Sequence, residues 1–130
     1  MYASIQNLTP LNCTVLVVDD EYSLRVSLAM ILEKAGYKVQ SAGNLSQART
    51  MLSKQHFDLI FLDMKLPDGM GGDLLPTINQ INPTPRVIIF SATPPNTLTF
   101  DPVDMGVTVY LEKPCDPEDI ILAARKVMAV

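Results

Sequence analysis

Three short runs of consecutive apolar residues stand out along this chain of 130 residues, at positions 15–18, 59–62 and 87–90. Continuous apolar runs of this length are typical of parallel strands that are covered on both faces. Residues 37–41 and 107–112 alternate apolar and polar side chains instead, as strands at the edge of a sheet do. The pattern therefore predicts five strands, at residues 14–19, 37–41, 58–63, 86–91 and 107–112.

Helical periodicity and helix-end signals fill the intervals between these strands. Five apolar residues share one helical face after the first strand: Leu24, Leu28, Ile31, Leu32 and Ala35. Gly36 follows them directly, as glycine often does where a helix ends. Asn44, with Gln47 three residues later, resembles a capping box. Asp116 before Pro117 predicts the N-cap of the last helix.

Two stretches depart from regular structure. Pro76 interrupts the third helix, whose apolar residues are Leu74, Leu75, Ile78 and Ile81, and predicts distorted first turns because proline removes a backbone donor. Residues 93–106 contain Pro94, Pro95 and Pro102 without helical periodicity. A fourth helix in this segment should therefore be short, displaced or mobile.

The alternation of strands and helices predicts one α/β domain at residues 14–130, after a flexible N-terminal tail at residues 1–13. Right-handed helical connections lead to a doubly wound, five-stranded parallel sheet of order 2-1-3-4-5, with about five helices. Ligands of such sheets bind beyond the carboxyl ends of the strands, where the strand order reverses. We therefore expect the functional site where the first and third strands end.

Composition narrows the classes of function. The net charge is −4 and no basic run is present, so the chain shows no footprint for direct nucleic-acid binding. Its apolar runs are far shorter than the roughly 20 residues of a membrane span, and residues 1–13 lack the pattern of a secretory signal. Cys13 and Cys115 lack metal-ligand or redox spacing and are interpreted as reduced thiols. We expect a cytoplasmic protein that binds neither nucleic acid nor membrane.

Polar side chains follow the predicted strands at one edge of the sheet, which we call the rim. Asp19 and Asp20 follow the first strand and Asp63 ends the third, while Ser91 and Lys113 end or follow the fourth and fifth. Three converging carboxylates repel one another, and a divalent cation, with Mg²⁺ favoured by all-oxygen ligands, relieves that repulsion. Asp63 can then supply the oxygen that attacks a phosphoryl group. Ser91 and Lys113 can each contact a phosphoryl oxygen.

These residues lie in motifs that resemble the response-regulator receiver domains of two-component signalling, the CheY-like family. The resemblance covers residues 14–130 and rests on four segments, Val17–Glu21, Leu62–Gly69, Phe90–Thr93 and Tyr110–Pro114. Each segment is a weak signal alone, whereas four in order at successive strand ends are highly specific. The resemblance implies a flavodoxin-like fold and a phosphorylation-controlled switch that is not an enzyme in its own right.

The resemblance also implies roles at the acidic end of the rim. Asp63 would be the phosphoacceptor. Asp19, Asp20 and Asp63 would hold Mg²⁺, together with the backbone carbonyl of Lys65.

On the other side of the rim, the resemblance implies that Ser91 and Lys113 contact the phosphoryl group. Ser91 and Tyr110 would be the switch residues, and the Lys113–Pro114 peptide bond would be cis. The donor would be a histidine kinase or phosphotransfer protein, and the receiver of the signal an effector domain or protein. The switched surface would comprise the fourth helix, fifth strand and fifth helix, where a homodimer would also form. The chain ends about where its fifth helix should, so we expect a single-domain regulator or part of a longer protein.

Simpler interpretations remain open for individual residues. Asp20 could merely cap the helix that begins near Tyr22, and Asp68 with Gly69 is interpreted as a turn. His56, the only histidine, is interpreted as a surface loop residue. These simpler interpretations do not explain why five polar residues, Asp19, Asp20, Asp63, Ser91 and Lys113, all lie at strand ends on one rim.

Two other classes of function compete with the phosphorylated switch. The irregular segment 93–106 motivates an unphosphorylated interaction module that keeps the fold alone. A phosphatase of the haloacid-dehalogenase type would also use an aspartate nucleophile, at the end of its first strand. Those enzymes carry a second aspartate two residues later, where this chain has Lys65. The complete set of acidic residues favours the switch.

Overall fold

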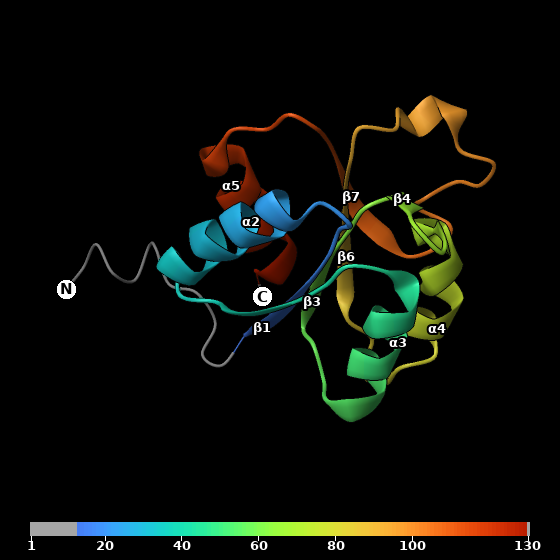
Figure 1. Cartoon of the computed structure of the whole chain (residues 1–130), viewed down its shortest axis with the longest axis horizontal. Coiled ribbons are helices and arrows are strands. Elements are labelled where there is room, and N and C mark those ends of the chain that lie inside the picture. Colours follow the sequence, from blue (N-terminus) through green and yellow to red (C-terminus); the bar gives the residue numbers. More distant parts are fainter. Residues whose placement is uncertain (1–12, 130) are drawn as a thin grey trace.

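The computed structural model describes residues 13–129, in which strands and helices alternate (Figure 1). The strands are β1 Thr14–Val18, β2 Lys38–Ala42, β3 Leu59–Leu62, β4 Lys65–Leu66, β5 Gly69–Met70, β6 Arg86–Ser91 and β7 Val107–Glu112. The α-helices are α2 Tyr22–Lys34, α3 Leu45–Lys54, α4 Leu75–Asn79 and α5 Pro117–Met128, and the 3-10 helices are η1 Gly71–Leu74 and η2 Pro95–Thr97. Residues 1–12 of the expected tail lie outside the described residues, whereas Cys13 is buried and belongs to the folded domain.

Five strands form one parallel sheet in the order β2-β1-β3-β6-β7. This order confirms the prediction, because β6 and β7 are the fourth and fifth strands of the sequence pattern. The remaining strands, β4 and β5, form a separate antiparallel hairpin. Helices α2 and α5 cover one face of the sheet, and α3 and α4 cover the other (Figure 1). The fold is therefore the expected doubly wound α/β architecture.

The apolar runs of the central strands supply both cores of the domain. Leu16 and Val18 of β1 pack in the core beneath α3 and α4, whereas Val15 and Val17 pack beneath α2 and α5. The edge strands β2 and β7 expose part of their side chains, as their alternating patterns predict. Each fully buried aliphatic side chain contributes about 1.5–3 kcal/mol to folding. The central strands therefore give the rim a rigid base.

The helix ends follow the sequence signals in part. Gly36 has a φ of 101° directly after α2, a conformation that glycine adopts without strain. The Asn44 side chain accepts a hydrogen bond from the Gln47 amide at 2.8 Å, but the Gln47 side chain accepts from the Gly43 amide, so the capping box is only half formed. Asp116 occupies the N-cap position of α5 without a side-chain capping bond. The predicted N-cap position is therefore confirmed, and the Asp116 backbone carbonyl accepts from the Asp119 amide at 3.0 Å.

The irregular stretches lie where the prolines predict them. The 3-10 turn η1 directly precedes α4, which contains Pro76 in its first turn and extends for only five residues. Between β6 and β7 the described chain contains only turns and η2. The place expected for a fourth helix is therefore occupied by a largely irregular segment. Within residues 13–129, no helix is long and apolar enough to cross a membrane.

Candidate functional site

The strand register places Asp19 and Asp63 side by side. β1 and β3 pair in parallel with Val18 opposite Leu62, so the next residue of each strand emerges at the same edge. The Asp63 amide donates to the Val18 carbonyl at 2.9 Å and extends the pairing by one residue. Both aspartates are buried, with 3% and 7% of their surfaces exposed. Adjacent buried carboxylates are unfavourable unless positive charge lies close to them.

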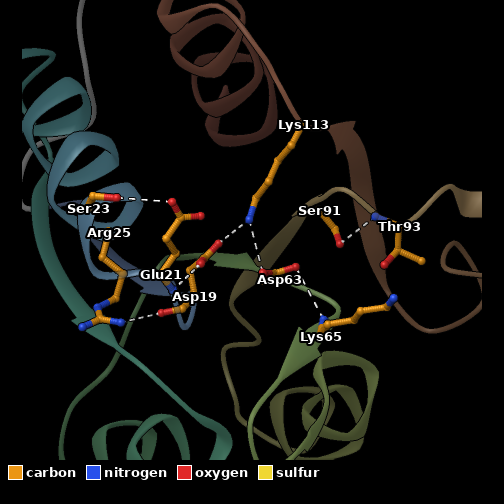
Figure 2. Close-up of polar contacts among 9 residues, drawn as sticks. All are labelled: Asp19, Glu21, Ser23, Arg25, Asp63, Lys65, Ser91, Thr93 and Lys113. Atoms are coloured by element: carbon orange, nitrogen blue, oxygen red, sulfur yellow. Dashed lines mark hydrogen bonds and ion pairs between the residues drawn. The ribbon is translucent and has the colours of Figure 1, made fainter.

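Lys113 supplies that positive charge. Its Nζ lies 2.6 Å from Asp19 Oδ2 and 3.2 Å from Asp63 Oδ2 (Figure 2). The Lys113 amide donates to the Ser91 carbonyl at 2.9 Å, which fixes the lysine at the end of β7. Burial opposes the charged form, but the hydrogen bond to Asp19 and the charges of both aspartates outweigh it and raise the pKa of Lys113. The lysine therefore remains a cation.

One lysine does not compensate fully for the aspartates. Burial is the main cause that raises the pKa of Asp19, and the nearby Asp63 charge adds to it. Hydrogen bonds from Lys113 and from the Glu21 amide, the latter at 2.9 Å, act in the opposite direction. Arg25 also donates to the Asp19 backbone carbonyl at 2.7 Å. The Asp19 side chain is thus held in place within an excess of negative charge.

Asp20 completes a group of three carboxylates. One oxygen from each of Asp19, Asp20 and Asp63 lies within 4.8 Å of the others. The N-cap of α2 is Glu21, so the interpretation of Asp20 as that cap is wrong. A group of carboxylate oxygens with one member exposed fits Mg²⁺, which prefers oxygen ligands and keeps several waters. Lys65, whose carbonyl is expected to join them, begins β4, and its amide contacts Asp63 Oδ1 at 3.5 Å.

The expected switch residues both contact Thr93. Ser91 is buried at the end of β6, and its Oγ accepts from the Thr93 amide at 3.2 Å. The Tyr110 hydroxyl donates to the Thr93 carbonyl. Burial first, and then the charges of Glu112 and Asp63, raise the pKa of Tyr110, so the hydroxyl keeps its proton at neutral pH. The bond between Lys113 and the proline after it is cis.

Asp68 has a role beyond the turn that its sequence suggested. Its two carboxylate oxygens accept from the Leu45 and Ser46 amides, at 2.8 and 3.0 Å, at the beginning of α3. The bond from Leu45 is the main cause that lowers the pKa of Asp68. The residue therefore caps a helix from a distant part of the chain. Local spacing gives no signal for such a contact.

Other expectations concern residues away from the rim. His56 is exposed, and its Nε2 contacts the Pro83 carbonyl at 3.0 Å, as suits a surface loop. Cys13 and Cys115 are free thiols. Burial raises the pKa of Cys13 to about 11, with a further contribution from the Asp58 charge. Neither thiol joins the acidic residues of the rim.

A cavity of about 740 Å³ opens over the rim. Its walls include all of the expected metal and phosphate contacts except Asp19, namely Asp20, Asp63, Lys65, Ser91 and Lys113. Residues 93–94 and 97–100 line it as well. The sequence did not indicate that the irregular segment faces the same cavity as Asp63.

The fold and the rim together define a doubly wound domain with a candidate cation site at its topological switch point. The chain belongs to the family of response regulator receiver domains, whose family model matches residues 15–125. Receiver domains are regulatory switches of two-component signalling and are not enzymes in the ordinary sense. The predicted family is therefore confirmed.

Individual relatives agree with this assignment. The chain is 37% identical over 116 residues to the alginate biosynthesis transcriptional regulatory protein AlgB of Pseudomonas putida, a match that covers 89% of this chain but only 26% of AlgB. It is 33% identical over 116 residues to sporulation initiation phosphotransferase F of Bacillus subtilis, with 89% of this chain and 94% of that protein covered. A Burkholderia pseudomallei response regulator structure with a phosphorylated aspartic acid, calcium ion and citrate superposes with a TM-score of 0.79 at 28% identity, covering 91% of this chain and 72% of that one. The chain thus spans about a quarter of AlgB's length and nearly all of phosphotransferase F.

Proposed function

We propose that this domain accepts a phosphoryl group on Asp63 in a magnesium-dependent reaction and thereby switches an output surface. The observation that supports this best is the meeting of Asp19, Asp20 and Asp63, whose oxygens lie within 4.8 Å of one another. Lys113 contacts two of the three at 2.6 and 3.2 Å. The phosphorylated aspartic acid and calcium ion of the Burkholderia pseudomallei structure support the same chemistry here.

Each residue of the rim has a part in the reaction. A carboxylate oxygen of Asp63 attacks phosphorus while the bond from phosphorus to the donor breaks. Lys113 pairs with one phosphoryl oxygen, and the Ser91 hydroxyl donates to another. Mg²⁺, held by Asp19, Asp20, Asp63 and the Lys65 carbonyl, would neutralise charge on the transferred group. The main contributions of the protein are positioning and charge neutralisation.

The phosphodonor in this proposal is a histidine kinase or a phosphotransfer protein in the cytoplasm. When Ser91 turns towards the phosphoryl group, its Oγ no longer accepts from the Thr93 amide at 3.2 Å. Tyr110, which is bonded to the Thr93 carbonyl, then responds to the movement of that residue. The population shifts between two states of the face formed by β7, α5 and segment 93–106. This face would contact the effector or a second copy of the chain.

Labelling with a small phosphodonor tests the assignment. Wild-type protein incubated with Mg²⁺ and phosphoramidate should gain one acid-labile phosphoryl group, measured by intact-mass spectrometry. Asp63→Asn should gain none, and chelation of Mg²⁺ should prevent labelling of the wild type. The exposed Asp104, outside the cavity, provides a matched control, since Asp104→Asn should be labelled normally. Unchanged labelling of the Asp63 variant would refute the assignment.

An unphosphorylated interaction module is the second candidate, and the irregular segment between β6 and β7 favours it. NMR spectra with Mg²⁺ and beryllofluoride, a phosphoryl mimic, separate the two functions. Chemical-shift changes that reach residues 93–112 support the switch. Changes confined to Asp19, Asp20 and Asp63 support the module.

A further inference from the structure

The cavity over the rim is larger than a phosphoryl group requires. Its volume of about 740 Å³ lies within the range of small-molecule pockets, roughly 300–1,000 Å³. Residues 93–94 and 97–100 contribute a second wall, beside the charged part of the cavity, which is formed by Asp20, Glu21, Asp63, Lys65, Asp73 and Lys113. Space therefore remains beside Asp63 for the part of a phosphodonor that leaves after transfer.

Three apolar side chains contribute to this second wall, Pro94, Leu98 and Phe100, which we call the apolar wall. Leu98 and Phe100 are partly buried and pack against the core beneath α3 and α4. The Phe100 ring also rests on Gly72, where an added Cβ would lie 2.8 and 2.9 Å from two ring carbons. Because residue 72 has no side chain, the ring can lie at the edge of the cavity.

Contacts at both ends hold the segment that carries the apolar wall. At its beginning, the Tyr110 hydroxyl donates to the Thr93 carbonyl. At its end, Asn79 Nδ2 donates to the Met105 carbonyl at 2.9 Å. The next residue, Gly106, has a φ of 88° and passes so close to Asn79 that a Cβ would lie 2.8 Å from its Oδ1. The wall therefore has a defined position relative to the rim.

We propose that Phe100 and Leu98 determine which phosphodonors the domain accepts, by packing against a flat ring in the leaving group. This inference rests on the proposed function of Asp63. Aromatic and apolar surfaces favour a planar ring over a small polar leaving group such as ammonia. The phosphohistidine of the donor in the proposed function carries an imidazole ring of this shape, so the apolar wall favours it over phosphoramidate.

The transfer step balances for both kinds of donor. N-phosphoimidazole enters with a proton on its second ring nitrogen, and the Asp63 carboxylate oxygen forms a bond to phosphorus. The electron pair of the breaking phosphorus–nitrogen bond returns to the ring, and neutral imidazole leaves. Phosphoramidate reacts in the same way from its NH₃⁺ form and releases ammonia. The two donors therefore differ mainly in the leaving group that would face Phe100.

Rates of labelling with these two donors test the proposal. Phe100→Ala and Leu98→Ala should each slow labelling by N-phosphoimidazole roughly threefold to tenfold, as expected for the loss of aromatic or apolar contacts. Labelling by phosphoramidate should change less than about twofold on the same grounds. Val103→Ala, in the same segment but 74% exposed and outside the cavity, should leave both rates unchanged. Phe100→Leu retains packing without the ring and gives the same comparison if Phe100→Ala does not fold.

A second measurement is independent of phosphorylation. The chain contains no tryptophan, so Phe100→Trp introduces a single tryptophan at the apolar wall, whose emission can be excited separately from that of the four tyrosines. Titration with imidazole alone should produce saturable quenching in this variant and only linear quenching in Val103→Trp. Equal rate changes with both donors, no rate change in Phe100→Ala and Phe100→Leu, or linear quenching at position 100 would overturn the proposal. Failure of the wild type to accept phosphoryl from either donor would instead overturn the proposed function of Asp63.

Discussion

Gly71 lies so close to Asp63 that a Cβ at position 71 would come within 1.9 Å of the Asp63 carbonyl oxygen. The Gly71 amide also donates to the Met64 carbonyl at 2.8 Å. The turn η1 therefore packs directly on the backbone that presents the Asp63 carboxylate. Since the neighbouring atom belongs to the backbone of a strand end, it cannot move aside as a flexible side chain would.

Gly71→Ala should consequently destabilise the domain and disturb Asp63. We expect a loss of about 1–3 kcal/mol in the free energy of unfolding, as for other overpacking substitutions. Urea denaturation measures this loss, and labelling by phosphoramidate reports the position of Asp63. Gly43→Ala is the milder comparison, because its Cβ would approach only side-chain ends, those of Arg25 at 3.0 Å and Gln47 at 3.5 Å, and not the backbone of a strand end. Equal stabilities of the two variants would contradict this account.

The local sequence pattern predicts some parts of the fold and the site but not others. The apolar runs determined the strand order, and parallel strand order in turn placed Asp19 beside Asp63, so the centre of the rim could be predicted. Asp68 contacts an amide 23 residues away, and the position of Phe100 depends on packing against Gly72. Contacts of this kind are decided by the folded arrangement of distant segments and leave no periodicity. By contrast, the N-cap of α5 at Asp116 follows from local sequence and was predicted correctly, although its side chain makes no capping bond.

Lys113→Gln should destabilise the folded domain, because it removes the positive charge that offsets the repulsion between Asp19 and Asp63. Breaking a buried ion pair costs about 3–5 kcal/mol and an exposed one about 0–1. The Lys113 side chain is 18% exposed and its partners are 4% and 9% exposed, so we expect a loss of about 2–3 kcal/mol in the free energy of unfolding. Urea denaturation in the presence of a chelator measures it.

Mg²⁺ should restore part of the stability of Lys113→Gln, because a ligand that binds only the folded state stabilises it. The same additions should stabilise the wild type less, since Lys113 already neutralises part of the rim. Lys126→Gln, on the exposed side of α5, serves as the control and should show neither effect. A variant whose stability is indifferent to Mg²⁺ would count against a cation site at Asp19, Asp20 and Asp63.

Asp68 should make the stability of α3 depend on pH. Its pKa in the folded protein is lowered from the ordinary value of 3.8, chiefly by the hydrogen bond from the Leu45 amide. A depressed pKa stabilises the folded state above the ordinary value, and this contribution disappears as the pH falls through the folded value. Asp68→Ala should therefore be less stable than the wild type at neutral pH, and the difference should shrink in acid. Urea denaturation at both pH values measures the difference, with Asp104→Asn as a control whose effect should be small at either pH. A difference that persists unchanged in acid would show that the charge of Asp68 is not responsible.

Tyr110→Phe removes the hydroxyl that donates to the Thr93 carbonyl while keeping the packing of the ring. We expect a small loss of about 0.5–1.5 kcal/mol in the free energy of unfolding, the usual net contribution of one hydrogen bond. The larger effect should be local, because the bond fixes the beginning of the segment that carries Phe100. Hydrogen exchange measured by mass spectrometry should show faster exchange of amides in residues 93–100. Tyr22→Phe, at a side chain that is 72% exposed on α2, should leave exchange in that segment unaltered. If Tyr110→Phe, like Tyr22→Phe, leaves amide exchange in residues 93–100 unaltered, the Tyr110 hydroxyl does not hold the segment. Any coupling of Ser91 to the output face must then pass through Thr93 without the Tyr110 hydroxyl.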